Sequence, residues 1–422
     1  MDAVLAELRR GALGAGDLRQ RLGVSRATLM RTVREVQPRV LAIGRARATR
    51  YALRETWPSL SSAHFPVFRV LASGEARAAG ELVTLAARQT AWMPGGVVSD
   101  GLPIALADAR PSGFLGRHFA ANHADLQLPL RLSDWSDHHI LLALSRRGED
   151  LTGNLIVGDE SFARWQGPAP TSHARADYPA LADATIHGHP PGSSAGGERP
   201  KFGVFVDGRH VLVKFAARSS AGDVVARRWC DLLLLEALAL KVIAMCGIAA
   251  AHAQIVDAGS QYFLESDRFD RVGARGRVSV VSLAAVQDDP AQTWSRAAAW
   301  LHNAGRLSHD DARKLRWLDA FGALIANTDR HPHNVALHDI DGDQLRLAPA
   351  FDQASMFYAP TADGQVPTRA FATPLATADT LDVWDDARAA ARDFWQRAAD
   401  DVRVSDGLRA QAATNARMLG GV

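Results

Sequence analysis

Two short apolar runs lie near the middle of the chain, at residues 204–206 and 210–215, with an Asp-Gly pair between them. Runs of this length, rich in Val and Phe, predict β-strands, and Asp-Gly is a strong signal for a hairpin turn. Longer stretches at 224–245 and 310–325 carry apolar residues at helical spacing and predict helices. The pattern therefore predicts a mixed α+β fold in which an antiparallel hairpin precedes a helical part.

The first 54 residues show a different pattern, of three short helices and a hairpin. Helices are predicted at 3–11, at 17–22 and after Ser25, which is a suitable N-cap. The expected buried stripe of the third helix is Leu29, Val33 and Val36. Apolar runs at both ends of segment 40–53 predict the hairpin. Three helices followed by a hairpin are typical of a winged helix-turn-helix, and residues 1–54 are predicted to form one.

Charge is unevenly distributed along the chain. Residues 1–54 contain 12 arginines and four acidic residues, a net charge of +8, whereas the whole chain carries only +2. A basic segment on a mildly acidic body is typical of polyanion binding, and we expect this segment to bind DNA. The candidate contacts are Arg26, Thr28 and Arg31 in the third helix and Arg45, Arg47 and Arg50 around the hairpin tip. The alternative is a small protein-docking module whose arginines are merely solvated.

The rest of the chain divides at changes in composition. The expected parts are a polar, proline-bounded linker at 55–66, a small subdomain at 67–185, part of a nucleotide-binding N-lobe at 186–271, and a helical C-lobe at 272–422. Within the small subdomain, strands are predicted at 150–157 and 163–165.

Composition favours a folded protein of a reducing compartment. Two cysteines, Cys230 and Cys246, lie in apolar surroundings, so we expect both to be buried and no disulfide framework to form. The N-terminus lacks the basic and apolar regions of a signal peptide. Charged residues interrupt the most apolar stretch, 232–253, so a buried helix is expected rather than a membrane span. We therefore expect a cytoplasmic protein without a membrane partner.

The segment Asn327-Thr-Asp-Arg-His-Pro-His-Asn334, with Asp352 after it, brackets an amide between two carboxylates. Phosphoryl transfer from ATP requires such a set of groups. Asp329 is the candidate catalytic base, which would orient and deprotonate an attacking hydroxyl. Asn334 and Asp352 are the candidate ligands of Mg²⁺, which would be held against the nucleotide phosphates. The spacing therefore predicts an ATP-dependent kinase.

Lys214, in the apolar run 210–215, is placed to reach the phosphates. A buried lysine needs a partner, and Glu236, an acid among leucines, is the expected one. A glycine-rich segment at 189–203 precedes both, and glycines let backbone N–H groups approach phosphate oxygens. Its candidate contacts are Ser193, Ser194, Gly196 and Gly197. Each feature also has a second interpretation. The glycine-rich segment would equally suit a flexible surface loop, and Lys214 would equally suit a lysine on an edge strand whose ammonium reaches solvent.

Further nucleotide contacts are expected from Glu265, Phe269 and His331. Glu265 ends a predicted strand, and residues 266–271 after it would connect two lobes with backbone groups facing adenine. His331 and His333 could also be interpreted as a two-histidine metal site. A third soft ligand at a suitable spacing is absent, so this interpretation is not favoured.

The Asp329–Asn334–Asp352 set and Lys214, together with the glycine-rich segment and the sequence Asp-Arg-Phe-Asp-Arg at 267–271, resemble the HipA family. This family consists of bacterial serine/threonine kinases that act as toxins of type II toxin–antitoxin systems. The resemblance extends over residues 80–400. A helix-turn-helix ahead of a HipA-like body is similar to the YjjJ-like subgroup.

The resemblance implies a bilobal protein-kinase-like fold that uses ATP and Mg²⁺. It also implies autophosphorylation of a serine in the glycine-rich segment, here Ser193 or Ser194, and a protein substrate such as an aminoacyl-tRNA synthetase. Family members are usually held by a separate helix-turn-helix antitoxin. Here such a module is fused, which suggests autoregulation within one chain and puts a separate antitoxin in doubt. Paired half-sites on DNA would suit a homodimer.

Two other functions remain open on the sequence. One is a DNA-binding transcription regulator whose kinase-like body senses a nucleotide with weak or no catalysis. The other is a kinase of small molecules, because other phosphotransferases share a similar Asp-x-x-x-x-Asn…Asp arrangement.

Overall fold

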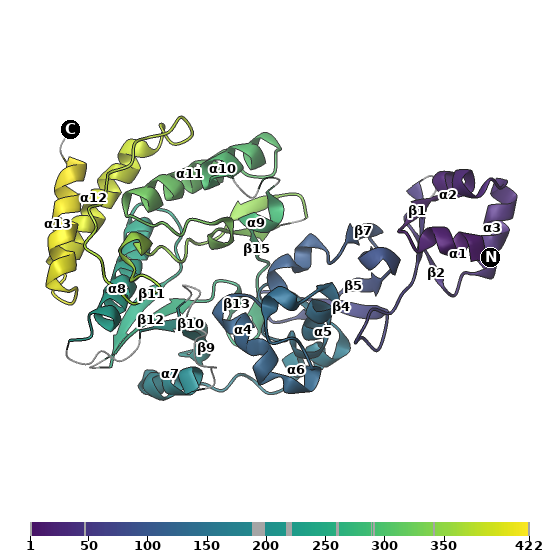
Figure 1. Cartoon of the computed structure of the whole chain (residues 1–422), viewed down its shortest axis with the longest axis horizontal. Coiled ribbons are helices and arrows are strands. Elements are labelled where there is room, and N and C mark those ends of the chain that lie inside the picture. The colour runs from purple at the N-terminus through teal and green to yellow at the C-terminus, as the bar shows by residue number, and fades with distance from the viewer. Residues whose placement is uncertain are drawn as a thin grey trace. The chain divides into compact units, whose positions relative to one another are not determined.

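The computed structural model describes residues 2–45, 48–187, 199–216, 222–258, 261–287, 289, 292–340 and 342–420 (Figure 1). The chain divides into two compact units. The first comprises Met1–Ser112 and Gly116–Pro168, and the second comprises Gly113–Leu115 and Ala169–Val422. Both contain helices and sheets, so the predicted mixed α+β class is confirmed. Within the described part of the chain, no helix is both long and apolar enough to cross a membrane.

The first unit begins with three helices and a small antiparallel sheet of order β1-β3-β2. The helices are α1 (Asp2–Leu8), α2 (Ala15–Leu22) and α3 (Arg26–Glu35), and the strands are β1 (Leu13–Gly14), β2 (Val40–Ile43) and β3 (Arg50–Leu53). Ser25 caps α3 as expected, because its hydroxyl oxygen accepts a hydrogen bond of 3.2 Å from the Thr28 N–H. Leu29 and Val33, which belong to the predicted buried stripe of this helix, are buried.

A five-stranded antiparallel sheet of order β7-β6-β5-β4-β8 forms the middle of this unit. Its strands are β4 (His64–Val70), β5 (Ala76–Thr84), β6 (Gln89–Met93), β7 (Val97–Asp100) and β8 (Leu155–Val157). Helix α5 (Asp137–Arg147) packs against this sheet, and its Ile140, Leu141 and Leu144 share one hydrophobic core with residues of the strands. Helix α4 (Gly113–Asn122) precedes it in the chain.

Segment 55–66 is packed against the middle sheet and is not the free linker that its polar composition predicted. Trp57 is buried, and its indole N–H donates a hydrogen bond of 2.9 Å to the Leu85 carbonyl. Strand β4 already begins at His64, and Phe65 is buried in the same core. The two large apolar side chains therefore override the polar residues around them.

The strand predicted at 163–165 is wrong, since these residues belong to helix α6 (Asp159–Gln166). Asp159 and Glu160 occupy its first turn, where carboxylates interact favourably with the helix dipole. The Phe162 ring stacks on Phe68 of β4, with centroids 3.7 Å apart. This contact attaches α6 to the sheet and favours the helix over a further strand.

The second unit contains an antiparallel sheet of order β11-β12-β10-β9. Its strands are β9 (Lys201–Val206), β10 (Arg209–Phe215), β11 (Ala253–Asp257) and β12 (Tyr262–Asp267). Asp207 and Gly208 both have positive φ, 49° and 75°, as a type I′ hairpin requires, so the predicted turn is confirmed.

Two helices flank this sheet. Helix α7 (Tyr178–His187) packs with Phe202, Val211 and Val213, and helix α8 (Val224–Met245) packs with Leu264. Val213 pairs with Glu265 across the sheet, and Lys214 pairs with Leu264. Because successive strand residues face opposite sides, Glu265 lies on the α7 face and Lys214 on the α8 face. On α8, Cys230 is buried as expected, whereas Cys246 at its C-terminal end is exposed.

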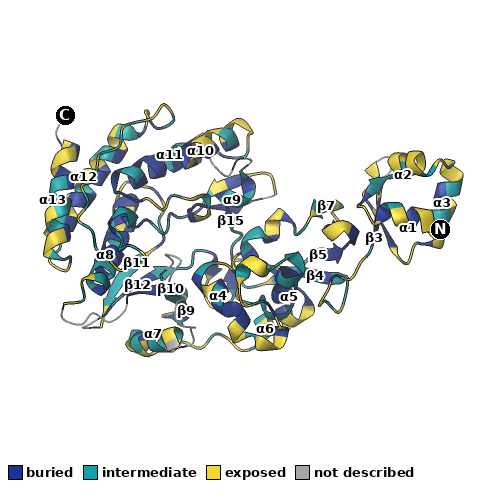
Figure 2. Cartoon of the chain, viewed as in Figure 1, coloured by how far each residue is buried: buried dark blue, intermediate teal, exposed yellow. Residues whose placement is uncertain are grey.

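The remainder of the second unit is mainly helical. Its helices are α9 (Leu283–Val286), α10 (Trp294–Asn303), α11 (His309–Leu324), α12 (Trp384–Asp400) and α13 (Asp406–Gly420). Its short strands are β13 (Arg271–Val272), β14 (Gly276–Arg277), β15 (Val281–Ser282), β16 (Ala336–Asp339) and β17 (Leu345–Leu347). Trp294, Phe321 and Trp395 are fully buried in its core, which appears as the dark blue faces of the helices in Figure 2. The loop with Asp329 lies between α11 and β16.

Candidate functional site

Lys214 joins three segments that are far apart in the sequence. Its ammonium lies 2.6 Å from Glu236 Oε1 on α8 and 2.6 Å from Asp352 Oδ1. The ion pair between Lys214 and Glu236 that the apolar surroundings predicted is therefore present. Burial alone would lower the pKa of Lys214, but Asp352 and Glu236 outweigh it and raise the pKa. The lysine is thus held charged in a buried position.

Asp352 follows β17 in an unusual backbone conformation. Its φ is +54°, in the left-handed region that a side chain with a Cβ rarely adopts. Burial would raise its pKa, but the cations of Lys214 and Lys201 hold the pKa well below its usual range. Strained backbone of this kind is concentrated at functional sites, where neighbouring contacts hold it in place.

Asp329 and Asn334 are fixed by hydrogen bonds within their loop. Asn327 Oδ1 accepts a bond of 2.9 Å from the Asp329 N–H, and Asn334 Nδ2 donates one of 2.9 Å to the Asp329 carbonyl. Burial raises the pKa of Asp329, although its side chain is 51% exposed and His331 Nε2 lies 3.7 Å away. Nearby Asp352 also raises it. The two aspartates thus have pKa values shifted in opposite directions.

Arg330 attaches this loop to the helices beneath it. Its Nε donates a bond of 3.2 Å to Asp319 on α11, and its guanidinium also donates to the Asn327 carbonyl. Asp319 in turn accepts from Ser295 on α10. A Cβ on Gly322 would lie 2.7 Å from Arg330 Cδ, so any other residue there would have to displace the Arg330 side chain. Sequence reasoning missed this anchor, and its one signal was an acid within the apolar face of a predicted helix.

The donor atoms fit a nucleotide with Mg²⁺. The Asn334 amide donates through Nδ2, so its oxygen would be the atom that binds a metal, and Asp352 would supply a carboxylate. Oxygen ligands of this kind are what Mg²⁺ prefers, usually one or two from the protein and the rest from phosphates and water. Among the described residues, no group of three or more His, Cys, Asp or Glu side chains could hold a metal alone. Asn334 and Asp352 are two oxygen donors, as many as Mg²⁺ commonly takes from a protein at a nucleotide site.

Of the other candidate nucleotide contacts considered next, Phe269 can be related to the site. Ser193, Ser194, Gly196 and Gly197 lie outside the described residues. The Phe269 ring packs 5.5 Å from the ring of Phe351, the residue before Asp352. Phe269 is thus connected to the site through a ring contact with the neighbouring residue.

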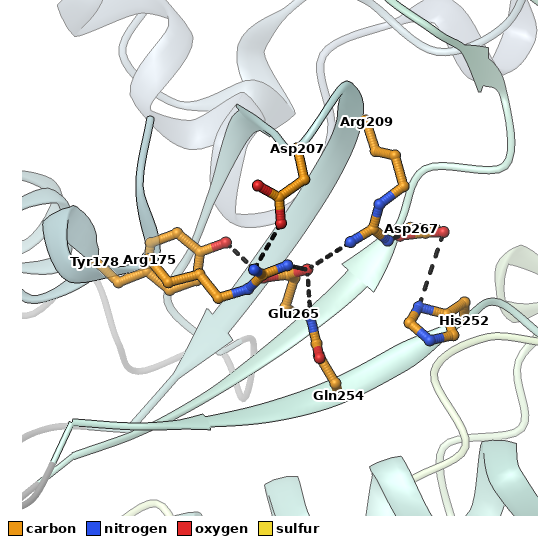
Figure 3. A network of polar contacts seen from close by, with 8 residues as sticks. All are labelled: Arg175, Tyr178, Asp207, Arg209, His252, Gln254, Glu265 and Asp267. Carbon is orange, nitrogen blue, oxygen red and sulfur yellow. Dashed lines mark hydrogen bonds and ion pairs between the residues drawn. The ribbon is translucent and has the colours of Figure 1, made fainter. Parts of the chain in front are cut away.

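The Glu265 carboxylate is not available to a nucleotide, so the expected contact cannot come from this side chain. Its carboxylate accepts from both Nε and Nη2 of Arg175, at 2.8 and 2.9 Å, and from the Tyr178 hydroxyl at 2.7 Å (Figure 3). Arg209 and Gln254 also donate to it, at 3.1 and 2.8 Å. Both oxygens are therefore saturated, on the sheet face opposite Lys214.

The candidate DNA contacts differ in their exposure and in the hydrogen bonds that they already form. Arg26 and Arg31 on α3 are exposed, and so is Arg45 next to the hairpin turn. Thr28 contributes its N–H and hydroxyl to the cap at Ser25. Arg50 is exposed but donates a bond of 2.8 Å to the Ala12 carbonyl, which ties β3 to the segment before β1. Arg47 lies outside the described residues.

Two parts of the chain match known protein families. Residues 61–166 match the YjjJ-like toxin, middle domain, and residues 193–417 match the HipA-like C-terminal domain. The curated protein Toxin YjjJ of Escherichia coli (strain K12) is 34% identical over 426 residues, which is 95% of this chain and 94% of that protein.

One solved structure shows the likeness in fold. The HipA chain of Shewanella oneidensis MR-1, solved with HipB and operator DNA, gives a TM-score of 0.53 at 14% identity, over 83% of this chain and 95% of that one. The Helicobacter pylori proinflammatory kinase CtkA gives a TM-score of 0.36 at 12% identity over 52% of this chain and 89% of that one, which is too low to carry weight. From the nearly full-length relative and the HipA-like match over more than half of its residues, the chain belongs to the YjjJ-like toxins of the HipA family.

Proposed function

We propose that this chain is an ATP-dependent protein serine/threonine kinase that binds DNA through residues 1–54. The observation that carries the catalytic part is the contact of buried Lys214 with both Glu236 and Asp352, at 2.6 Å each. Kinases position a cation at the nucleotide phosphates by pairing a lysine with a helix glutamate in this way. The HipA-like match and the HipA-like fold support the same proposal.

Asp329 is the proposed catalytic base. Its raised pKa makes the carboxylate a better acceptor for the proton of a serine or threonine hydroxyl. Asn334 and Asp352 would hold Mg²⁺, and Lys214 would orient the phosphates. When bound, ATP with Mg²⁺ would supply the phosphoryl group and neutralise the charge that develops during transfer.

Incubation of the purified chain with γ-labelled ATP and Mg²⁺ tests the catalytic proposal. We expect label on the chain itself, with Ser193 and Ser194 as the proposed acceptors, and we expect EDTA to prevent it because Mg²⁺ bridges the phosphates. Label that survives the Ser193→Ala/Ser194→Ala double substitution would place the acceptor elsewhere. ATP binding without any label would favour the second candidate function, a DNA-binding regulator whose kinase-like body senses a nucleotide.

The proposed DNA-binding module is a winged helix-turn-helix with α3 as the recognition helix. Arg26 and Arg31 are exposed near the N-terminal end of α3, which is the end that such a helix presents to the major groove. The HipA chain with a similar fold was solved together with HipB and operator DNA, which supports DNA as a partner of this family. Fusion of the module would allow one chain to do both tasks.

Replacement of Arg26 and Arg31 by alanine should weaken DNA binding and flatten its salt dependence. Each lost phosphate contact should reduce the slope of log affinity against log salt by about 0.9, or about 2 for the double variant. Fluorescence anisotropy with a labelled duplex at several salt concentrations measures this slope. An Arg392→Ala/Arg417→Ala variant is the control, since it removes two exposed arginines from α12 and α13. Equal slopes in the two variants would contradict the assignment of α3.

A further inference from the structure

Arg199 is a buried cation whose charge is poorly matched by its present contacts. Its side chain is only 10% exposed, and its nearest carboxylate oxygen, Glu236 Oε2, lies 4.0 Å from Nη1. Neither of these two atoms forms a hydrogen bond with any described residue. Its other contacts are weak, a bond of 3.5 Å to the Met356 sulfur and the Trp229 ring at 4.9 Å. A buried guanidinium normally has better partners than these.

Arg199 lies close to Lys214 on the neighbouring strand. Strand β9 begins at Lys201, which pairs directly with Lys214 of β10. Arg199 precedes Lys201 by two residues, so an extended chain directs both side chains to the same side of the sheet. Burial lowers the pKa of Arg199, whereas the carboxylates of Glu236, Asp352 and Asp329 raise it. The guanidinium therefore lies among the groups of the proposed active site.

Lys214 has few donors left for a phosphate. An ammonium carries three N–H groups, and two of them are directed at Glu236 and Asp352. The carboxylates of Glu236, Asp352 and Asp329 lie near this site, so a polyphosphate would gain from a further cation beside Lys214 and the proposed Mg²⁺. Arg199 offers donors that no described residue uses, in a planar fork that suits phosphate oxygens.

We propose that Arg199 is a second phosphate-binding cation of this site, and that it exchanges its weak contacts at Glu236 and Trp229 for the nucleotide polyphosphate. This inference rests on the proposed function, because it concerns the same nucleotide site. It assigns a specific role to a residue within the glycine-rich segment. Arg199 would then discriminate ligands by the number of their phosphates, whereas Trp229 would hold the guanidinium in place until a ligand arrives.

The test compares the affinities of ATP, ADP and adenosine for the full-length chain by calorimetry in the presence of Mg²⁺. Arg199→Met keeps an unbranched side chain over Trp229 but removes the charge. It should weaken ATP about tenfold to a hundredfold, as expected for lost charged hydrogen bonds, weaken ADP less, and leave adenosine unchanged. Arg199→Lys should fall between Arg199→Met and wild type, because it retains the charge without the fork.

A matched control is Arg228→Met. Arg228 is also largely buried on α8, but its Nη1 donates to the Tyr358 carbonyl and its nearby carboxylate is Asp231. This variant should leave the ratio of ATP to adenosine affinity unchanged. The same ratio in Arg199→Met as in wild type would overturn the inference, even if all three affinities fell together, since that result indicates a structural role only. Wild-type protein that binds neither ATP nor ADP would instead refute the proposed nucleotide site, and the inference with it.

Discussion

Replacement of Asp329 by alanine will lower phosphoryl transfer by about a hundredfold to ten-thousandfold, the usual contribution of a general base. ATP affinity should remain close to that of wild type. Asp329 forms no ion pair with Lys214, whose ammonium is held by Glu236 and Asp352. Because the side chain is half-exposed, its loss should also leave the fold intact. The measurement is the initial rate of label transfer from ATP, together with ATP affinity by calorimetry.

His333→Ala is a suitable control for the Asp329 variant. His333 is exposed in the same loop, two residues after His331, and its ring contacts only that of His331 among the described rings. A change that merely disturbs the loop would lower the rate in both variants. Full activity in Asp329→Ala would show that another group removes the proton, and a loss of ATP affinity equal to the loss of rate would assign Asp329 to binding.

The parts of the site that were predictable are those that local sequence encodes. Asp329 and Asn334 lie in one short segment, and the conflict between a charged side chain and apolar neighbours was enough to pair Lys214 with Glu236. The antiparallel hairpin before them was predictable from the Asp-Gly turn, which both φ angles confirm. Residue type and short spacing carry this information because the physical constraint is local.

The parts that sequence reasoning missed depend on contacts between distant segments. Arg175 binds Glu265 across 90 positions of the chain, so nothing near Glu265 indicated that its carboxylate was already saturated. Trp57 likewise packs against a sheet whose strands come later, which turned an apparent linker into part of a core. Such pairings depend on strand order and helix packing, and residue patterns do not encode either directly.

Glu265→Gln should destabilise the second unit by about 3 kcal/mol at neutral pH. The Glu265 side chain is 1% exposed, and its carboxylate holds Arg175 and Tyr178, which precede the glycine-rich segment, against β12. Burial alone would raise its pKa, but hydrogen bonds from Arg175, Tyr178 and Gln254 lower it from the usual 4.5 to about 2. A glutamine cannot carry this charge, so the stabilisation by the arginines is lost.

The pH dependence of this effect follows from the lowered pKa. The unfolded chain takes up a proton on Glu265 near pH 4.5, whereas the folded chain does so only near pH 2. The stabilisation is therefore fully present above about pH 5 and is lost as the pH falls from about 4.5 to about 2. The stability difference between wild type and Glu265→Gln should be largest at pH 7 and should shrink steadily over this range.

Denaturant unfolding of both proteins at pH 7, 4 and 2.5 measures this difference, and the subtraction removes the titration of all other carboxylates. Asp393→Asn is the matched control, because Asp393 also binds an arginine, Arg397 at 2.7 Å, but both side chains are 41% exposed. Solvent screens such a pair, so the control should remain close to wild type at every pH. A stability difference for Glu265→Gln that stays constant from pH 7 to 2.5 would contradict the charge-based explanation and would assign the effect to packing alone.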